Sequence, residues 1–255
     1  MDEIIKGENR AYEKYEEVLI RRDNLKKEAE QYHHEFIRVF GDYITESFKL
    51  KIECIKKKKM IAYCQALENQ GKKILSSNLR AFIEKEMADY QAELDAMILD
   101  VNAAKKASAI SPTDLKKIKD IYYGLVKLLH PDLHPELAGD EQIKEYWKKI
   151  EIAYRHNQLE DIQELDIVVR RYLARRGYND TAIEVEDVEE KIKKVEDEIT
   201  EIITTNPYLY KILLNDERSV KEKTIEYKEE IESYQSYSER LDEILSRFKI
   251  EEMYS

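Results

Sequence analysis

The sequence predicts an all-α protein of long helices, arranged as a coiled coil or helical bundle with a shorter helical hairpin inserted into it. Charged residues make up 38% of the 255 residues, whereas the chain has only 6 glycines and 4 prolines. This composition, rich in Glu, Lys, Leu and Ile, is typical of long helices. Apolar side chains also recur at alternating steps of three and four over long stretches, which is the spacing of helices that supercoil on one another.

Residues 1–106 are predicted to form an N-terminal long-helix coiled-coil region. We expect Gly41 to interrupt its first helix and the breakers around Gly71 and Ser76 to form a loop. A second helical stretch runs from Leu79 to Lys106. The stripe of the first helix steps strictly by four and three and includes one charged residue: Ala11, Tyr15, Val18, Arg22, Leu25, Ala29, Tyr32, Phe36, Val39 and Tyr43.

The segment from Ser111 to Leu129 has the clearest helix signals of the chain. Serine is a good N-cap, and Pro112 at the first helical position loses no needed hydrogen bond. An apolar stripe follows, and three lysines lie off it and should face water: Lys116, Lys119 and Lys127. The helix must stop near His130, because a residue before proline is disfavoured in the α region.

The loop that follows, residues 130–139, is predicted to be stiff, because Pro131 and Pro135 both restrict it. A stiff loop loses less entropy when a partner binds it, which suits a recognition element. The next helix presents Ile143, Trp147, Ile150 and Tyr154 on one face, and a further amphipathic stretch ends near Gly177. Residues 107–177 should therefore form a separate module in which two antiparallel helices bury their stripes against each other.

A helix, a His130-Pro131-Asp132 loop and a second helix ending in Ala153-Tyr154 together resemble the J-domain, the DnaJ-like co-chaperone module. The resemblance implies binding to a DnaK-type ATPase and acceleration of its ATP hydrolysis, with the His-Pro-Asp loop as the trigger. It also implies that Lys116, Lys119 and Lys127 dock on an acidic surface of that ATPase and that Asp132 meets an arginine of the partner. The helix–helix stripe matches the family at Ile118, Tyr122, Leu125, Trp147, Ile150, Ala153 and Tyr154.

Several features depart from the family pattern. Tyr123 and Gly124 stand where basic residues are usual, and Leu133 replaces a residue that is usually basic. The usual first helix is not recognisable, so we expect the helix from Leu79 to Lys106 to take its place. Residues 111–176 contain 12 basic and 12 acidic residues, so the module is neutral rather than basic.

Residues 178–255 are predicted to form an acidic helical hairpin. Two heptad runs, Val185 to Ile202 and Val220 to Phe248, are separated by Asn206-Pro207, which should break the helix and let the two runs fold back on each other. The N-terminal helix would pair with this hairpin. A narrow stripe rich in tyrosine, with Arg22 and Ser238 inside it, is an imperfect closed core and suits binding to a client helix or a second copy.

Charge and composition exclude several functions. The formal net charge of −11 lies in residues 177–255, which have 11 basic and 22 acidic residues, so neither nucleic acid nor an anionic membrane is expected as a partner. No run of 18 apolar residues exists, and the start lacks the apolar core of a signal peptide. Cys54 and Cys64 are too far apart on one helix for a disulfide. We expect a cytoplasmic, reduced protein.

No cofactor or metal site is predicted. His33-His34 with Cys54 and Cys64 has no zinc spacing, and the prolines deny His130 and His134 the geometry of a helical metal pair. The sequence thus predicts a J-domain-like co-chaperone or adaptor that is not itself an enzyme and whose helical arms hold a client or partner. The alternative is a structural coiled-coil scaffold with a degenerate J-like fold, in which His130-Pro131-Asp132 only stops a helix and Asp132 satisfies a backbone amide.

Overall fold

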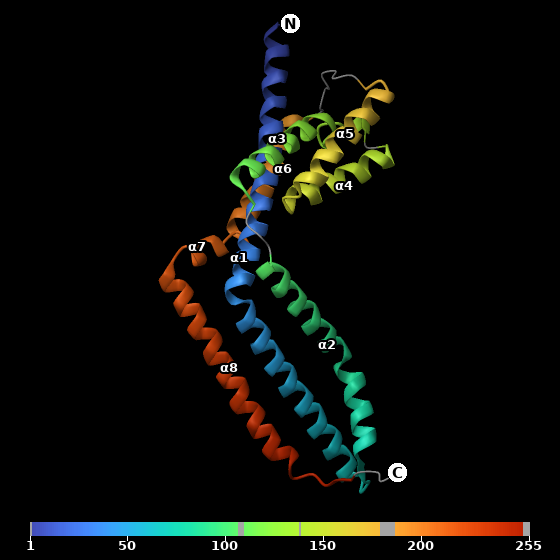
Figure 1. Cartoon of the computed structure of the whole chain (residues 1–255), viewed down its shortest axis with the longest axis vertical. Helices are drawn as coiled ribbons and strands as arrows, with labels where there is room; N and C mark the ends of the chain where they lie inside the picture. The colour runs from blue at the N-terminus through green and yellow to red at the C-terminus, as the bar shows by residue number, and fades with distance from the viewer. Residues whose placement is uncertain (1, 107–109, 138, 179–186, 252–255) are drawn as a thin grey trace. The chain divides into compact units, whose positions relative to one another are not determined.

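The computed structural model describes residues 2–106, 110–137, 139–178 and 187–251, and it confirms the all-α fold (Figure 1). Two short strands pair in parallel, with Ile74 opposite Ile250 and Leu75 opposite Glu251. The elements in order are α1 (Asp2–Asn69), β1 (Ile74–Leu75), α2 (Ser76–Lys106), α3 (Pro112–Leu129), the 3-10 helix η1 (Pro135–Leu137), α4 (Glu141–Arg155), α5 (Leu159–Arg175), α6 (Val188–Thr204), α7 (Tyr210–Leu214), α8 (Glu217–Leu245) and β2 (Ile250–Glu251).

The chain forms two compact units, and α1 contributes to both. The first unit comprises residues 1–33 and 108–211, and the second comprises residues 34–107 and 212–255. This division differs from the predicted boundaries at 106 and 177. The physical reason is that the J-like segment does not bury its apolar surface alone, because α1 and α6 complete the same core.

The core of the first unit gathers apolar side chains from five helices. Tyr122 of α3 is its largest fully buried side chain, and the Tyr122 ring stacks on Tyr154 with 3.7 Å between centroids. Trp147 is also buried, as predicted from its place on the stripe. Other members are Tyr15, Val18 and Leu19 of α1, Ile118 and Leu125 of α3, Ile150 of α4, Ile162 and Val169 of α5, and Ile192, Val195 and Ile199 of α6.

The helix from Leu79 to Lys106, which was expected to pack on the helix–loop–helix segment, does not belong to this core. Leu79, Ile83 and Met87 of α2 belong to the core of the second unit, together with Ile52 and Cys64 of α1. In the first unit, the N-terminal part of α1 packs on the J-like helices instead. The α1 segment lies about a hundred residues upstream, so local sequence could not identify it.

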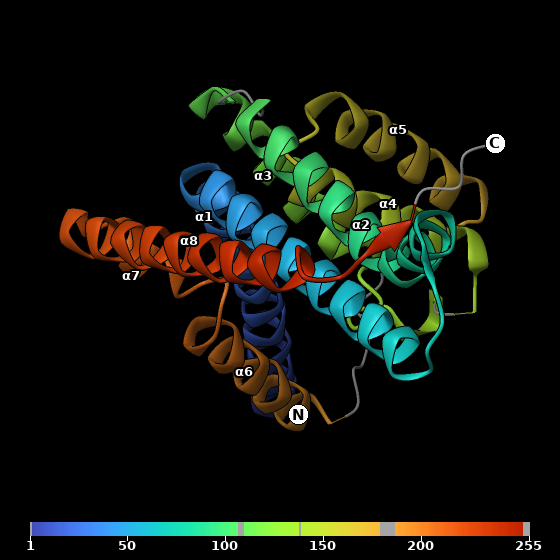
Figure 2. The same ribbon diagram turned by 90° about the horizontal axis from the view of Figure 1, so that it is seen from below.

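The second unit contains the C-terminal part of α1, α2 and α8 (Figures 1 and 2). The helix α1 continues through Gly41, so the expected interruption is wrong. A Cβ atom at Gly41 would lie only 2.7 Å from Cγ2 of Val101, so glycine lets α2 approach α1 closely. The predicted hairpin of the two C-terminal runs is also wrong, because α6 belongs to the first unit and α8 to the second.

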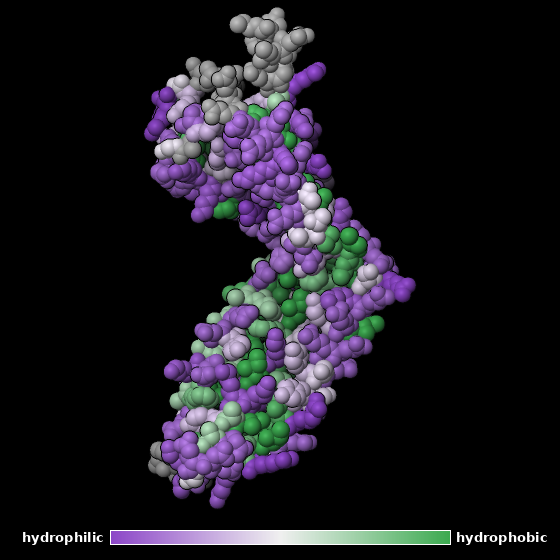
Figure 3. Space-filling view, turned by 180° about the vertical axis from the view of Figure 1, so that it is seen from behind, coloured by the Kyte–Doolittle hydropathy of each residue, from purple (hydrophilic) through white to green (hydrophobic). Residues whose placement is uncertain are grey.

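Apolar side chains remain exposed on the second unit. Figure 3 shows a band of hydrophobic residues along the middle of this unit, between hydrophilic margins. Among the described residues of the unit, Leu99 is 71% exposed, and Val39, Ile98 and Ile225 are exposed as well. Ser238, the polar residue of the α8 stripe, is buried and accepts a hydrogen bond from Lys57 Nζ at 2.7 Å. None of the described helices is both long enough and apolar enough to cross a bilayer.

Candidate functional site

The helix α3 forms as the sequence predicts and delivers the His-Pro-Asp loop at its C-terminal end. Ser111 Oγ accepts a hydrogen bond from the backbone N–H of Asp114 at 3.1 Å, and Pro112 occupies the first turn. The helix ends at Leu129, and His130 has an extended backbone with ψ of 128°, as expected before proline. The predicted start and stop of this helix are therefore confirmed.

Two leucines anchor the loop to the core of the first unit. Leu133 and Leu137 are buried in the core of the first unit. The backbone N–H groups of Leu133 and His134 both donate to the carbonyl of His130, at 2.9 and 2.8 Å. Leu133, directly after the His-Pro-Asp tripeptide, thus fixes the loop to the core.

The side chain of Asp140 fixes the far end of the loop. It caps α4 by accepting from the backbone N–H of Gln142 at 3.0 Å. The hydroxyl of Tyr172 donates to Asp140 at 2.8 Å, and Arg176 forms an ion pair with Asp140 at 3.0 Å. Because α5 supplies both Tyr172 and the following Arg176, the hairpin is closed by α5.

His130, the first residue of the loop, is buried, with a relative exposure of 3%. Its ring packs edge-on against Trp147 at 4.7 Å, and its Nδ1 accepts from the backbone N–H of Asp132 at 3.0 Å. Burial, together with the positive charge of Arg22, lowers the pKa of His130 to about 4, although Asp23 and Asp132 oppose the shift. The ring is therefore neutral at neutral pH, and because Nδ1 is an acceptor, its proton lies on Nε2.

Arg22 of α1 faces this loop and has a side chain only 10% exposed. Its guanidinium lies 3.0 Å from Asp23 Oδ1, 3.3 Å from Glu198 Oε2 and 3.7 Å from Asp132 Oδ2. Nη2 also lies 3.4 Å from Nε2 of His130, but a protonated Nε2 cannot accept from it. One buried cation thus brings together carboxylates from α1, α6 and the loop.

The tip of the loop is accessible while its base is not. Pro131 is exposed, and the side chain of Asp132 is 47% exposed despite its contact with Arg22. Asp132 can therefore accept a hydrogen bond from a cation outside the molecule, but that cation must compete with Arg22. Among the described residues, no backbone N–H donates to the carboxylate of Asp132, whose charged neighbour is Arg22, so the structure does not place Asp132 as a helix-stop ligand for a backbone amide.

The three predicted lysines are exposed, but they differ in their surroundings. Lys127 forms an ion pair with Glu16 of α1 at 2.7 Å. Nζ of Lys119 lies 5.5 Å from the ring centroid of Tyr123. Lys116 faces solvent one turn earlier on α3. The basic face of α3 thus exists, although part of its charge is balanced by α1.

Arg22 is the residue of this site for which the sequence predicted no role. Its signal was present, because it is the one charged residue in the apolar stripe of the first helix. The pattern showed that the position should be buried. It did not show which charged groups would surround it, because those groups come from distant parts of the chain.

No metal site forms among the described residues, because no cluster of three or more His, Cys, Asp and Glu side chains occurs there. His134 already has partners at both nitrogens, with Nε2 2.6 Å from the carbonyl of Lys127 and Nδ1 3.1 Å from Glu136. Cys54 and Cys64 are free and buried.

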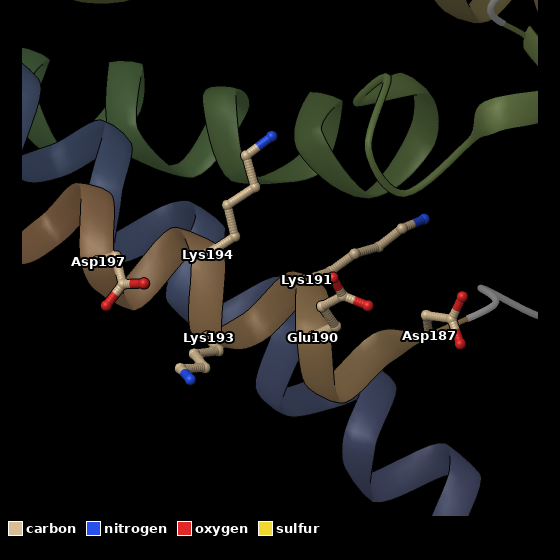
Figure 4. Close-up of a pocket in the computed structure, with 6 residues that line it drawn as sticks. All are labelled: Asp187, Glu190, Lys191, Lys193, Lys194 and Asp197. Atoms are coloured by element: carbon tan, nitrogen blue, oxygen red, sulfur yellow. The ribbon is translucent and has the colours of Figure 1, made fainter.

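A cavity of about 500 Å³ on the surface of α6 also lacks the features of a site. The described side chains that line it all come from α6 or the residue before it (Figure 4). Lys191 and Lys194 extend to one side of the helix and Lys193 extends to the other. Because these side chains point in different directions, their charges do not act together on one ligand atom.

Comparison with known proteins identifies no relative: no family model matches the chain, and no curated protein or solved structure is similar to it. The geometry of the helix–loop–helix segment is therefore the basis for proposing a function.

Proposed function

We propose that this chain is a J-domain-like co-chaperone or adaptor that recruits a DnaK-type ATPase through His130-Pro131-Asp132 and stimulates its ATP hydrolysis. The observation that carries the proposal is the exposed Pro131-Asp132 tip on a rigid base, held between two helices that share one core. The exposed Lys116, Lys119 and Lys127 on the preceding helix supply charge that steers an acidic partner.

When no partner is bound, the carboxylate of Asp132 in the loop contacts Arg22. An arginine of the partner would bind the same carboxylate that Arg22 now faces. The Arg22–Asp132 distance of 3.7 Å is long, and the carboxylate is half exposed, so this contact is weak. A well-placed arginine of the partner can therefore displace it without unfolding the buried pair of Arg22 and Asp23.

The test is the steady-state ATPase activity of a DnaK-type protein with wild type and with the His130→Gln variant. Wild type should increase the rate, and the variant should not, because glutamine cannot reproduce the ring packing of His130 on Trp147. Lys148→Met, on the exposed side of α4, is the control and should behave as wild type. No stimulation by wild type, or equal stimulation by wild type and His130→Gln, would overturn the proposal.

The second candidate is a structural scaffold whose J-like hairpin has no chaperone role. The buried His130 and the internal partner of Asp132 favour it. A scaffold should leave the ATPase rate unchanged and should instead associate with itself or with other helices. Sedimentation of the purified chain together with the ATPase assay separates the two candidates.

The helical arms would hold the client in the first case and the second copy in the other. The band of exposed apolar side chains on the second unit supports either role. The arms therefore support both candidates equally, and the experiments that separate them are made on the loop.

A further inference from the structure

A buried lysine without an acidic partner lies on α1 in the first unit. Lys27 is only 8% exposed. Its Nζ lies 3.8 Å above the ring centroid of Tyr154, and among the described residues neither an ion pair nor a hydrogen bond engages this ammonium. The other face of the Tyr154 ring stacks on Tyr122. A buried ammonium without a counter-ion is costly, so the position requires an explanation.

Lys27 lines a cavity of about 360 Å³ between α1 and α3. Two other cations line the same cavity, Arg21 from α1 and Lys119 from α3. Among the described residues that line it, Glu28 is the only acid, so these residues give the cavity a net positive charge. Burial and the nearby charge of Lys119 lower the pKa of Lys27 to about 8, which is the direction expected when cations crowd together without an anion.

The cavity adjoins the surface on which the proposed function depends. Lys119 is both a wall of the cavity and a member of the basic face of α3. Residues 111–176 are neutral overall, so α3 to α5 alone offer little net attraction for an acidic partner. Arg21 and Lys27 add the missing positive charge from a helix outside that segment.

We propose that this cavity is a carboxylate-binding site that receives an acidic side chain of a partner protein, so that the docking surface is built from α1 and α3 together. The inference rests on the proposed function, because it extends the same docking face. A carboxylate entering the cavity would meet three cations and would provide Lys27 with its missing counter-ion. The size of the cavity suits a side chain with a few neighbouring groups.

The site can be tested without any chaperone by using a fluorescently labelled hexaglutamate peptide and measuring its anisotropy. Wild type should bind it, and Lys27→Met should weaken binding by about tenfold, the loss expected for one charge-assisted contact. Lys148→Met is the matched control and should bind as wild type. Free glutamate at the same carboxylate concentration should not compete, because it lacks the neighbouring acids that Arg21 and Lys119 would bind.

Several outcomes would overturn the site. They are failure of wild type to bind the peptide, equal binding by Lys27→Met, and full competition by free glutamate, which would indicate a small-molecule site. Methionine has a similar length and no charge, so this variant should fold, and an unchanged melting temperature verifies it. The ammonium of Lys27, followed by NMR, should have a higher pKa in the peptide complex than in the free protein.

The ATPase assay separates failure of the site from failure of the proposed function. If wild type and Lys27→Met stimulate a DnaK-type ATPase equally, the docking role of the cavity is wrong while the co-chaperone function stands. If neither stimulates but Lys27 still determines peptide binding, the carboxylate site stands while the partner class is wrong.

Discussion

Arg22 and Lys27 lie little more than one turn apart on α1, yet their surroundings are opposite. The guanidinium of Arg22 is within 4 Å of carboxylates from Asp23, Asp132 and Glu198. The ammonium of Lys27 has an aromatic ring and two other cations near it. A buried charge needs a partner of opposite charge. The Arg22 site is therefore a closed site, because carboxylates of its own chain surround the cation, and the Lys27 site is an open site, which can accept a ligand. The difference separates the structural cation from the one that is available for binding.

The largest expected effect is on the closed site. Arg22→Ala should reduce the free energy of unfolding by about 3 kcal/mol, because it leaves the buried carboxylate of Asp23 without its cation. The chain has a single tryptophan, Trp147 in the core of the first unit, so urea unfolding followed by its fluorescence reports this unit. Lys14→Ala, which removes an exposed pair with Glu196, is the control and should cost about 0.5 kcal/mol. Equal costs would show that Arg22 is not a structural cation.

A second loss is expected from the hydroxyl that supports the same carboxylate. Tyr122 donates to Asp23 Oδ2 at 2.7 Å in the core. Tyr122→Phe should lower the free energy of unfolding by about 2 kcal/mol, because the bond is to a charged acceptor. Tyr154→Phe removes a bond to the neutral amide of Asn24 and should cost about 1 kcal/mol. The reverse order would contradict the account of Asp23 as a charged, buried acceptor.

Protonation of His130 at acidic pH should lower the free energy of unfolding. The folded-state pKa of His130 is lowered to about 4 from 6.5, so folding favours the neutral ring. Its contribution is complete above pH 6.5 and is lost as the pH falls toward 4, and between pH 6.5 and 5.5 the loss should be about 1 kcal/mol. The charged and titratable groups around the ring are Arg22 and Asp23 of α1, Asp132 and His134 of the loop, and Glu198 of α6 through Arg22.

The measurement is the difference in urea unfolding between wild type and His130→Gln at each pH, which cancels the titration of the carboxylates. If the difference in the free energy of unfolding between the two proteins does not change between pH 6.5 and 5.5, the His130 ring is not held buried in its neutral form.

The smallest effect is expected at the open site. Lys27→Met should leave the free energy of unfolding unchanged or raise it by about 0.5 kcal/mol, since it removes an unpaired buried charge while it also removes the contact with the Tyr154 ring. Thermal unfolding compared with Lys148→Met measures this. A destabilisation as large as that of Arg22→Ala would mean that Lys27 is structural and that the contrast between the two cations is wrong.

Local signals predicted the parts of this fold that depend on local chemistry. Ser111-Pro112 set the start of α3, and Pro131 set its end, because capping and proline sterics act within a few residues. The burial of Trp147 followed from the helical period in the same way.

The rest of the fold depends on which apolar stripes, from helices far apart in the sequence, pack against each other. The period of the first helix showed that Arg22 would be buried, but its neighbours Asp132 and Glu198 are more than a hundred residues away. Gly41 has the composition of a breaker, yet its role is to admit Val101 of another helix. The role of Lys27 was missed for the same reason, since Lys119 and Tyr154 come from other helices.

In the proposed function, the exposed carboxylate of Asp132 acts on another molecule. The most direct measurement is the ATP hydrolysis rate of a DnaK-type protein with wild type, with Asp132→Asn and with Asp120→Asn, an exposed acid on α3 that serves as control. Wild type and Asp120→Asn should increase the rate, and Asp132→Asn should not. Equal rates with wild type and Asp132→Asn would contradict it.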